Sequence, residues 1–398
     1  MPVDLRALPE KRVLPTPPRL WRWCLVVLLC TVLGAGLVVL LWPQDLGQMP
    51  LWYWCCVVVF PAIGGLLLFA LRRLIYERQH DFAQGWNLSR GELEQTLIQQ
   101  GQRSIAVLAT SYCTAAGNNQ LARALRGGSK PLQPTYLADM ATTMRLSQLA
   151  PVPKFYTEQE YTERLTSYVH QVVRGLDEEL QRFACTTPVC VRIRHNQDVS
   201  DEKILSLWRE CIRDALVADQ VSFANQDDGL LWLDTWLDDP SPCPLMLSLE
   251  INLFQQPAAE QAESVSVLLL AQPEWCSREK VVPASWIHRP VPMTGQAESL
   301  QDMFLWGRVQ EDQTPLFAWQ TQVPTRHLCE VSISMSAAGH PLDLERCQSL
   351  DDSLGLPGCA VGNLALVVAC EHASTERQPQ LVMMQDASPQ WCVVQVAG

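Results

Sequence analysis

Two long apolar runs near the N-terminus constrain this chain most. Residues 24–41 and 51–71 contain no charged side chain and are 18 and 21 residues long. At 1.5 Å per residue, a helix of either length can cross roughly 30 Å of membrane hydrocarbon. The sequence therefore predicts an N-terminal tail and transmembrane hairpin over residues 1–79, followed by a helical connector over residues 80–103.

The charges that flank the two spans predict the orientation of the hairpin. Five Lys or Arg residues precede the first span, three follow the second, and the short connection between the spans has none. Because cytoplasmic flanks are enriched in Lys and Arg, both ends of the hairpin should face the cytosol. A cleaved signal peptide is the alternative for the first span, but no small-residue cleavage site follows it. The expected location is a bacterial inner membrane, crossed twice, with the C-terminal body in the cytoplasm.

Charge and cysteine usage exclude several functions for the body. Residues 80–398 carry 22 Lys or Arg against 38 Asp or Glu, a net charge of −16. An acidic body argues against nucleic acid as a partner, because phosphate binding needs basic surface. The 15 cysteines include no Cys-x-x-Cys pair, and a cytosolic location makes them free thiols. We therefore expect neither a bound metal nor another cofactor.

The pattern of apolar residues beyond the connector predicts a layered α/β domain. Continuous or alternating apolar runs indicate strands, and apolar positions three and four apart indicate helices. Residues 244–256 remain open between strand and helix. The expected strands are 104–110, 189–195, 229–236, 264–272, 281–291 as an edge partner, 327–336, 380–386 and 391–397; the expected helices begin after Thr157 and Ser200 and cover 341–350 and 362–373.

A short echo within the sequence raises the question of an internal duplication. "YCTAAGNNQLA" (112–122) and "MSAAGHPLDLE" (335–345) both follow a β-branched run and both pass through Ala-Ala-Gly into a helix-like pattern. The order of predicted elements also partly restarts in the second half. Two similar halves are therefore expected, at residues 104–292 and 293–398.

Three further segments carry a resemblance to a known family. They are "DDPSPCPLMLSLEI" (238–251), "GHPLDLE" (339–345) and "GLPGCAVGNLALVVA" (355–369). They resemble the nucleophile elbow, the HGTGTxxGDxxE segment and the GHxxxAxG turn of the thiolase-like superfamily, which includes the β-ketoacyl synthases. The resemblance implies a duplicated α-β-α-β-α layered domain.

The same resemblance implies that catalysis has been lost. Family chemistry needs a thiolate at a helix N-terminus and two imidazoles. Here Cys243 matches the nucleophile only in place, His340 matches one histidine, and Leu356 stands where the second belongs. This favours a catalytically degenerate protein over an enzyme. An acyl-thioester-dependent acyltransferase that uses Cys243 and His340 remains the enzymatic alternative.

A membrane anchor joined to an inactive body suggests an adaptor or accessory protein. The arrangement is loosely similar to the adaptor family that accompanies type VI secretion lipase effectors, which implies an effector or a secretion-apparatus component as the partner. A structural inner-membrane component, self-associating through Gly34-Ala35-Gly36, is the other alternative. Asp234, Asp238 and Asp239 are expected in a solvated loop. The aromatic candidates for an exposed contact surface, within the Pro-rich segment 273–325, are Trp275, Trp286, Trp306 and Trp319.

Overall fold

The computed structural model describes most of the chain in two compact units. One unit comprises residues 4–97 and the other residues 98–398 with the first three residues. Each unit is described by itself. The described residues are 3–42, 50–138, 141–151, 154–184, 187–212, 218–239, 243–294, 297–310 and 315–397.

Two helices dominate the N-terminal unit, and both are long and apolar enough to cross a membrane. The first is α1 (Leu20–Leu41). The second begins with α2 (Pro50–Trp54), passes through a π-helical turn (Cys55–Val59) and continues as α3 (Phe60–Gly101). The π turn ends two residues before Pro61, whose missing N–H cannot complete an ordinary helical ladder. Both apolar runs are therefore helical, as predicted.

Small residues allow the two apolar helices to approach each other. A Cβ atom added at Gly34 would lie 2.5 Å from the Cβ of Pro61, and one at Gly65 would lie 3.0 Å from the Cα of Val27. A Cβ at Gly36 would meet no atom within 4 Å. Gly34, which we considered for self-association, is therefore used for packing inside the hairpin.

The segment before the first span lies along the part of α3 that follows the second. Arg90 donates a hydrogen bond to the carbonyl oxygen of Pro9 (2.7 Å), and Trp86 donates one to that of Glu10 (3.1 Å). The side chain of Asn87 pairs with both backbone groups of Arg12 at 2.9 Å, and the Arg12 guanidinium covers the rings of Phe82 and Trp86. The two flanks of the hairpin therefore lie side by side.

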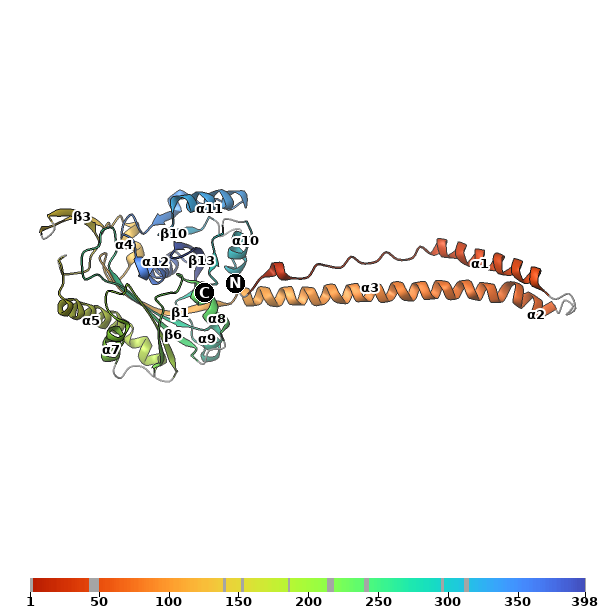
Figure 1. Cartoon of the computed structure of the whole chain (residues 1–398), viewed down its shortest axis with the longest axis horizontal. Coiled ribbons are helices and arrows are strands. Elements are labelled where there is room, and N and C mark those ends of the chain that lie inside the picture. The colour runs from red at the N-terminus through yellow and green to blue at the C-terminus, as the bar shows by residue number, and fades with distance from the viewer. Residues whose placement is uncertain are drawn as a thin grey trace. The chain divides into compact units, whose positions relative to one another are not determined.

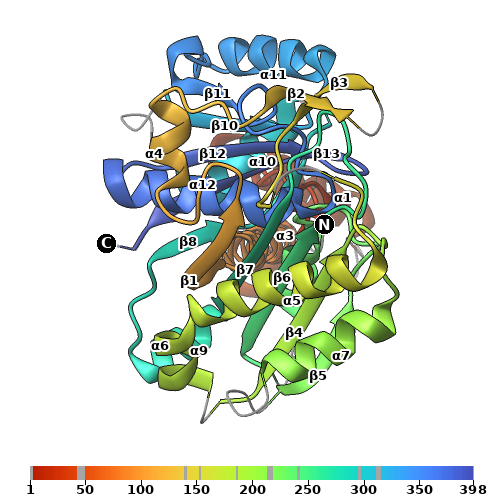
Figure 2. The same ribbon diagram turned by 90° about the vertical axis from the view of Figure 1, so that its left-hand side faces the viewer.

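Five layers make up the body, as Figure 2 shows best. Helices α5, α7 and α9 cover the outer face of the strands of residues 189–271. Helices α4, α8 and α12 lie between these strands and those of residues 317–396. Helices α10 and α11 cover the outer face of the strands of residues 317–396 (Figures 1 and 2). The predicted α-β-α-β-α layering is confirmed. The helices are α4 (Leu121–Arg126), α5 (Glu158–Arg174), α6 (Asp177–Glu179), α7 (Asp201–Cys211), α8 (Leu231–Asp238), α9 (Pro273–Glu279), α10 (Ala297–Trp306), α11 (Thr325–Ala337) and α12 (Val361–Glu376).

Among the described residues, eleven strands form one sheet, in which ten follow the order β11-β10-β12-β13-β8-β1-β7-β6-β4-β5 and β9 pairs with β13 beside them. Strands β2 and β3 form a separate hairpin. The strands are β1 (Ser104–Thr114), β2 (Gln133–Leu137), β3 (Thr142–Leu146), β4 (Val189–His195), β5 (Ala218–Phe223), β6 (Leu245–Asn252), β7 (Ser264–Ala271), β8 (Ser285–His288), β9 (Val291–Pro292), β10 (Phe317–Thr321), β11 (Cys347–Ser349), β12 (Gln380–Gln385) and β13 (Pro389–Val396).

The body contains a repeat of six elements. The sequence β4-α7-β5-α8-β6-β7 gives the strand order β5-β4-β6-β7, and β10-α11-β11-α12-β12-β13 gives the order β11-β10-β12-β13. In both copies the first strand is parallel to the second and third, and the last two strands are antiparallel. The repeated topology therefore covers residues 189–271 and 317–396.

The Ala-Ala-Gly echo does not mark this repeat. Residues 112–117 form the end of β1 and the turn that follows it. Residues 327–336, predicted as a strand, belong to helix α11. The β-branched residues of this segment suggested a strand, but its buried positions, Val331 and Met335, are four residues apart, as in a helix. Residues 341–350 are also not a helix, because they form a short 3-10 turn and β11.

Two other element predictions were wrong. Residues 229–236, predicted as a strand, lead into helix α8, which buries Leu233 and Leu237 one turn apart. Residues 281–291 do not form an edge strand, because β8 pairs with β1 on one side and β13 on the other. The ambiguous segment 244–256 contains strand β6.

Candidate functional site

Two loops lead from a strand into a central helix. Residues 224–230 connect β5 to α8, and residues 350–360 connect β11 to α12. We call residues 224–230 the first elbow. Because β4, β5 and β6 are mutually parallel, this elbow lies at the carboxyl edge of these strands, where open α/β sheets bind their ligands. A nucleophile of the family's kind would belong here.

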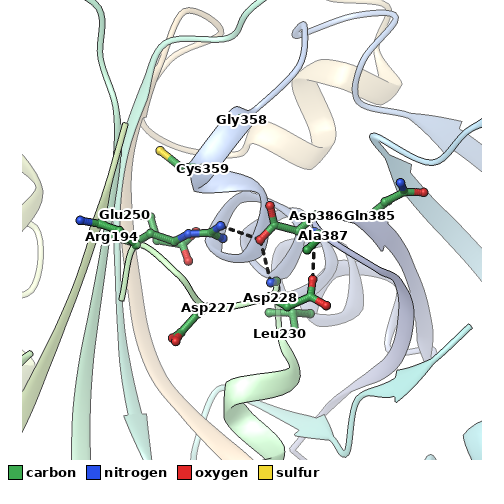
Figure 3. A network of polar contacts seen from close by, with 12 residues as sticks. Arg194, Asp227, Asp228, Leu230, Glu250, Gly358, Cys359, Gln385, Asp386 and Ala387 are labelled. Carbon is green, nitrogen blue, oxygen red and sulfur yellow. Dashed lines mark hydrogen bonds and ion pairs between the residues drawn. The ribbon is translucent and has the colours of Figure 1, made fainter. Parts of the chain in front are cut away.

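Carboxylates fix the first elbow to the hairpin between β12 and β13 (Figure 3). Asp228 accepts hydrogen bonds from the backbone N–H groups of Ala387 and Ser388, both at 3.0 Å. Asp386 accepts one from the backbone N–H of Gly229 at 2.8 Å. The elbow of the first copy is therefore tied to the second copy by reciprocal carboxylate–backbone contacts.

Arg194 joins β4 to the same carboxylate. Its Nη2 lies 2.6 Å from Oδ2 of Asp386, and only 7% of its side chain is exposed. Its Nε and Nη1 atoms are buried and lack a hydrogen-bond partner among the residues that the structure describes. The negative charges of Glu250 and Asp386 raise the pKa of Arg194 and outweigh its burial, so the guanidinium stays charged.

Beside Arg194, a second arginine of β4 reaches the central helix through Glu250. Arg192 lies 3.1 Å from Glu250 and 2.9 Å from Asp227. Glu250 is fully buried and also accepts a hydrogen bond from the backbone N–H of Asn363 in α12 at 2.8 Å. These contacts and those of Arg194, Asp228 and Asp386 form one set, which we call the elbow network.

The turn before α12 completes the elbow network. The Cys359 thiol donates to the carbonyl oxygen of Ile251 at 3.1 Å, and burial raises its pKa to about 12. The backbone N–H of Gly358 donates to Oε1 of Gln322 (3.2 Å), and Nε2 of Gln322 donates to the carbonyl oxygen of Gln385 (3.1 Å). The Cys359 thiol is therefore protonated at neutral pH and is a poor nucleophile.

The structure corrects the expected place of Cys243. This residue follows helix α8 and precedes β6, so it lies in a helix-to-strand connection and not at a strand-to-helix elbow. It is buried. The true elbow comes earlier in the sequence because residues 231–238 are helical, and it contains Asp227, Asp228 and Gly229 but no Cys, Ser or His.

His340 and Leu356 also differ from the family pattern. His340 follows the C-terminal end of α11, and its ring lies 4.4 Å from the ring of Phe304 in α10. It lines a groove with residues of α10, on a different element from those of the elbow network. Leu356, in the turn before α12, forms a bridge with Gln261 and supplies no imidazole.

Three of the four tryptophans expected at the surface are buried. Trp275, Trp306 and Trp319 are at most 3% exposed, and Trp286 is partly buried. The segment 273–325 supplies β8, α10 and β10, so its tryptophans belong to the core of the fold. The expectation of an exposed aromatic surface on these residues was wrong.

Asp234 and Asp238, expected in a solvated loop, lie in helix α8, and Asp239 directly follows it as the C-cap. Asp234 and Asp238 both bind Arg289, whose side chain is fully buried. Arg289 also donates to the carbonyl oxygen of Gln100 at 3.0 Å. Within the described ranges, no group of three or more His, Cys, Asp or Glu residues could hold a metal ion.

Sequence reasoning missed Arg194 and its partners, although one signal was present. In "VCVRIRH" the apolar side chains of Val189, Val191 and Ile193 pack against the outer helices, and the alternation turns both arginines to the inner face. Two arginines on the inner face of a buried strand require buried carboxylates. That these carboxylates are Glu250 and Asp386 could be learned only from the three-dimensional structure.

Comparisons with known proteins agree with this architecture. No protein-family model matches the sequence, and no curated protein matches it. The structure is similar to a ketosynthase from module 1 of the bacillaene synthase of Bacillus amyloliquefaciens, with a TM-score of 0.54, 8% identity, and coverage of 75% of this chain and 77% of that chain. It is also similar to ketosynthase twelve of that synthase, with a TM-score of 0.51, 9% identity, and coverage of 75% and 74%. The body therefore has the thiolase-like fold.

Proposed function

We propose that this chain is a membrane-anchored, catalytically inactive protein of the thiolase-like fold that serves as an adaptor or accessory component. The observation that carries the proposal is the first elbow. It contains no Cys or Ser nucleophile, and the hydrogen bonds of Gly229 with Asp386 and of Asp228 with Ala387 tie it to the second copy. Acyl transfer by this fold would need an open thiolate at that place.

The acyltransferase alternative gains no support from the positions of its two residues. Cys243 lies at the start of β6, whereas His340 follows α11 and packs against Phe304. Cys359, the thiol within the elbow network, has a pKa of about 12. The Cys359 thiol therefore does not have the environment of a reactive thiolate.

The membrane part of the proposal is a two-pass anchor in a bacterial inner membrane, with the body on the cytosolic side. Two observations support it. Eight Lys or Arg residues flank the hairpin and none lies between the spans. The contacts of residues 9–12 with Trp86, Asn87 and Arg90 bring the two flanks together, which supports a common side of the membrane for both.

We propose that the binding partner is another protein. The link to a type VI secretion effector or apparatus component comes from the sequence resemblance. A purely structural role through self-association is less favoured, because Gly34 packs against Pro61 of the same chain. The net charge of the body, −16 for residues 80–398, continues to disfavour nucleic acid.

Thioester labelling tests the loss of catalysis. The full chain in detergent is incubated with an alkyne-bearing acyl-coenzyme A, and intact mass and click detection report covalent acylation. We expect no acylation above that of the Cys243→Ser variant. Stoichiometric labelling of the wild type that Cys243→Ser abolishes, without loss of folding, would establish the acyltransferase instead.

In-membrane cross-linking tests the adaptor role. The full chain, expressed in its native host, is cross-linked in intact membranes and purified in detergent. We expect one protein other than the chain itself to be recovered in near-stoichiometric amount and to re-bind the purified chain. Recovery of cross-linked copies of this chain alone would favour a structural role.

A further inference from the structure

A surface groove of about 710 Å³ lies beside the C-terminal end of β1. Its walls come from the turn that contains Ala115 and Gly117, from residues 148–151 and from helix α5. Strands β1 and β6 run in the same direction, because both are antiparallel to β7. The groove is therefore at the same carboxyl edge as the first elbow, where α/β sheets bind ligands.

Primary amides and apolar side chains line this groove. Asn118, Gln148 and Gln171 contribute amides, and Leu149 and Pro151 contribute apolar surface. No charged residue is found among the described residues that line it, although residues 80–398 carry a net charge of −16. A ligand for this groove should therefore be uncharged where it binds, because a bound charge would lose hydration without gaining a counter-charge.

One acceptor in the groove lacks a donor. The Oε1 atom of Gln148 is buried and has no hydrogen-bond partner within the described part of the chain. A buried polar atom without a partner loses its hydration and gains no hydrogen bond in return, which lowers stability. If the Gln148 side chain turns toward the groove, an N–H group of a ligand can supply the missing donor.

The loop that carries Gln148 is held rigidly. The next residue, Leu149, donates its N–H to Glu263 at 2.9 Å and accepts a hydrogen bond from Arg164 at 2.6 Å. Arg164 and Glu263 form a buried ion pair, with Nη1 3.0 Å from Oε1. The backbone next to Gln148 is therefore held in place, which reduces the entropy lost on binding.

We propose that this amide-lined groove binds an uncharged, extended peptide segment of a protein partner. A peptide main chain offers alternating N–H and C=O groups, and a primary amide offers both donors and an acceptor to match them. The volume suits a short segment. This inference rests on the proposed adaptor function and gives the chemistry of the partner.

Peptide selection tests the proposal on the full chain in lipid nanodiscs. The probe is a phage-displayed library of random dodecapeptides. Enriched peptides are synthesised, and their affinity is measured for the wild type, for Gln148→Glu, and for Gln171→Glu, which changes an exposed residue of α5. The matched control is Gln181→Glu, which places the same charge on an exposed glutamine outside the groove.

We expect uncharged sequences to be enriched, with affinity lowered at least tenfold by Gln148→Glu and Gln171→Glu and changed less than twofold by Gln181→Glu. Failure to enrich any peptide, or equal affinity for the wild type and both groove variants, would overturn the proposal. So would glycan-array binding that Gln148→Glu abolishes, because it would assign the groove to sugars.

Two results distinguish this inference from the adaptor proposal. If cross-linking still recovers the partner with Gln148→Glu, this inference fails while the adaptor role stands. Acylation of Cys243 would defeat the adaptor role and leave the peptide measurements valid.

Discussion

At the scale of single residues, buried charge distinguishes this protein from a plain layered domain. Arg192, Arg194, Glu250 and Asp386 gather where two strand-to-helix loops meet the central helix. Buried ions persist only when each is paired, and breaking a pair leaves an uncompensated charge. The elbow network therefore holds the two copies together at a place where an enzyme of this fold would keep an open site.

The pair between Arg194 and Asp386 should contribute measurably to stability. Removing one partner leaves the other charge buried, so we expect Arg194→Met to lower the free energy of unfolding by about 3–5 kcal/mol. Asp386→Asn should lower the free energy of unfolding less in the Arg194→Met variant than in the wild type. The difference, the coupling energy of the pair, should be about 1–3 kcal/mol. Urea denaturation of all four proteins in detergent measures the cycle. Strict additivity would show that the two residues act independently.

Burial of His288 predicts sensitivity to acid. Burial lowers the pKa of this histidine to about 4, compared with about 6.5 in the unfolded chain. Only the unfolded state binds the proton between these values, so stability is complete above about pH 6.5 and is lost progressively as the pH falls toward 4, by up to about 3 kcal/mol. His288→Leu should remove this part of the pH dependence.

Unfolding curves at pH 7.5, 6 and 4.5 test that prediction. The control is His170→Leu, a change at a partly exposed histidine of α5, which should keep the pH dependence of the wild type. An unchanged slope in His288→Leu would mean that other groups cause the acid sensitivity.

At the scale of elements, close packing fixes the end of helix α3 against the body. A Cβ atom added at Gly101 would overlap the ring of Trp306, whereas one at Gly91, in the same helix, would meet no atom within 4 Å. Gln102 also donates a hydrogen bond to the carbonyl oxygen of Leu305 at 3.0 Å. The last turn of α3 is therefore part of the packed domain, and Gly101 is needed there because a larger residue would overlap Trp306.

Two alanine substitutions compare these positions. Gly101→Ala should lower the free energy of unfolding of the body by about 1–3 kcal/mol, because overpacking displaces Trp306. Gly91→Ala should leave it unchanged, or raise helix stability by up to about 1 kcal/mol, because alanine is the better helix former. Thermal unfolding followed by tryptophan fluorescence measures both. Equal stability of the two variants would contradict the contact with Trp306.

At the scale of the whole molecule, the sequence of the hairpin decides where the body is found. The basic flanks and the contacts of residues 9–12 with α3 support the proposed topology, in which both ends of the hairpin lie on one side. On that proposal, the hairpin presents an acidic body to cytosolic proteins near the membrane.

Reporter fusions test this topology. In a bacterial host, alkaline phosphatase fused after residue 46, within the connection between the spans, should be active because it is exported. Green fluorescent protein fused after residue 398 should fluoresce because the C-terminus stays in the cytosol. The reverse pattern would overturn the orientation, and active phosphatase at both positions would show that the second run does not cross the membrane.

The sequence alone determined the features that depend on local pattern. Uninterrupted apolar runs predicted both hairpin helices. Alternation predicted β4, and a buried apolar run predicted β7, each within one residue of its ends. The buried helix α12 was also predicted, because its apolar residues are continuous. The layered thiolase-like architecture followed from the resemblance.

Only the tertiary structure decided which loop is the elbow and which side chains meet there. Residues 229–236 and 327–336 are rich in residues that fit strands, and contacts between layers made them helices. That shift moved the elbow from Cys243 to Asp228 and Gly229. Arg194 and Asp386 are 192 positions apart and are joined by pairing between two copies of one motif, which no local pattern encodes.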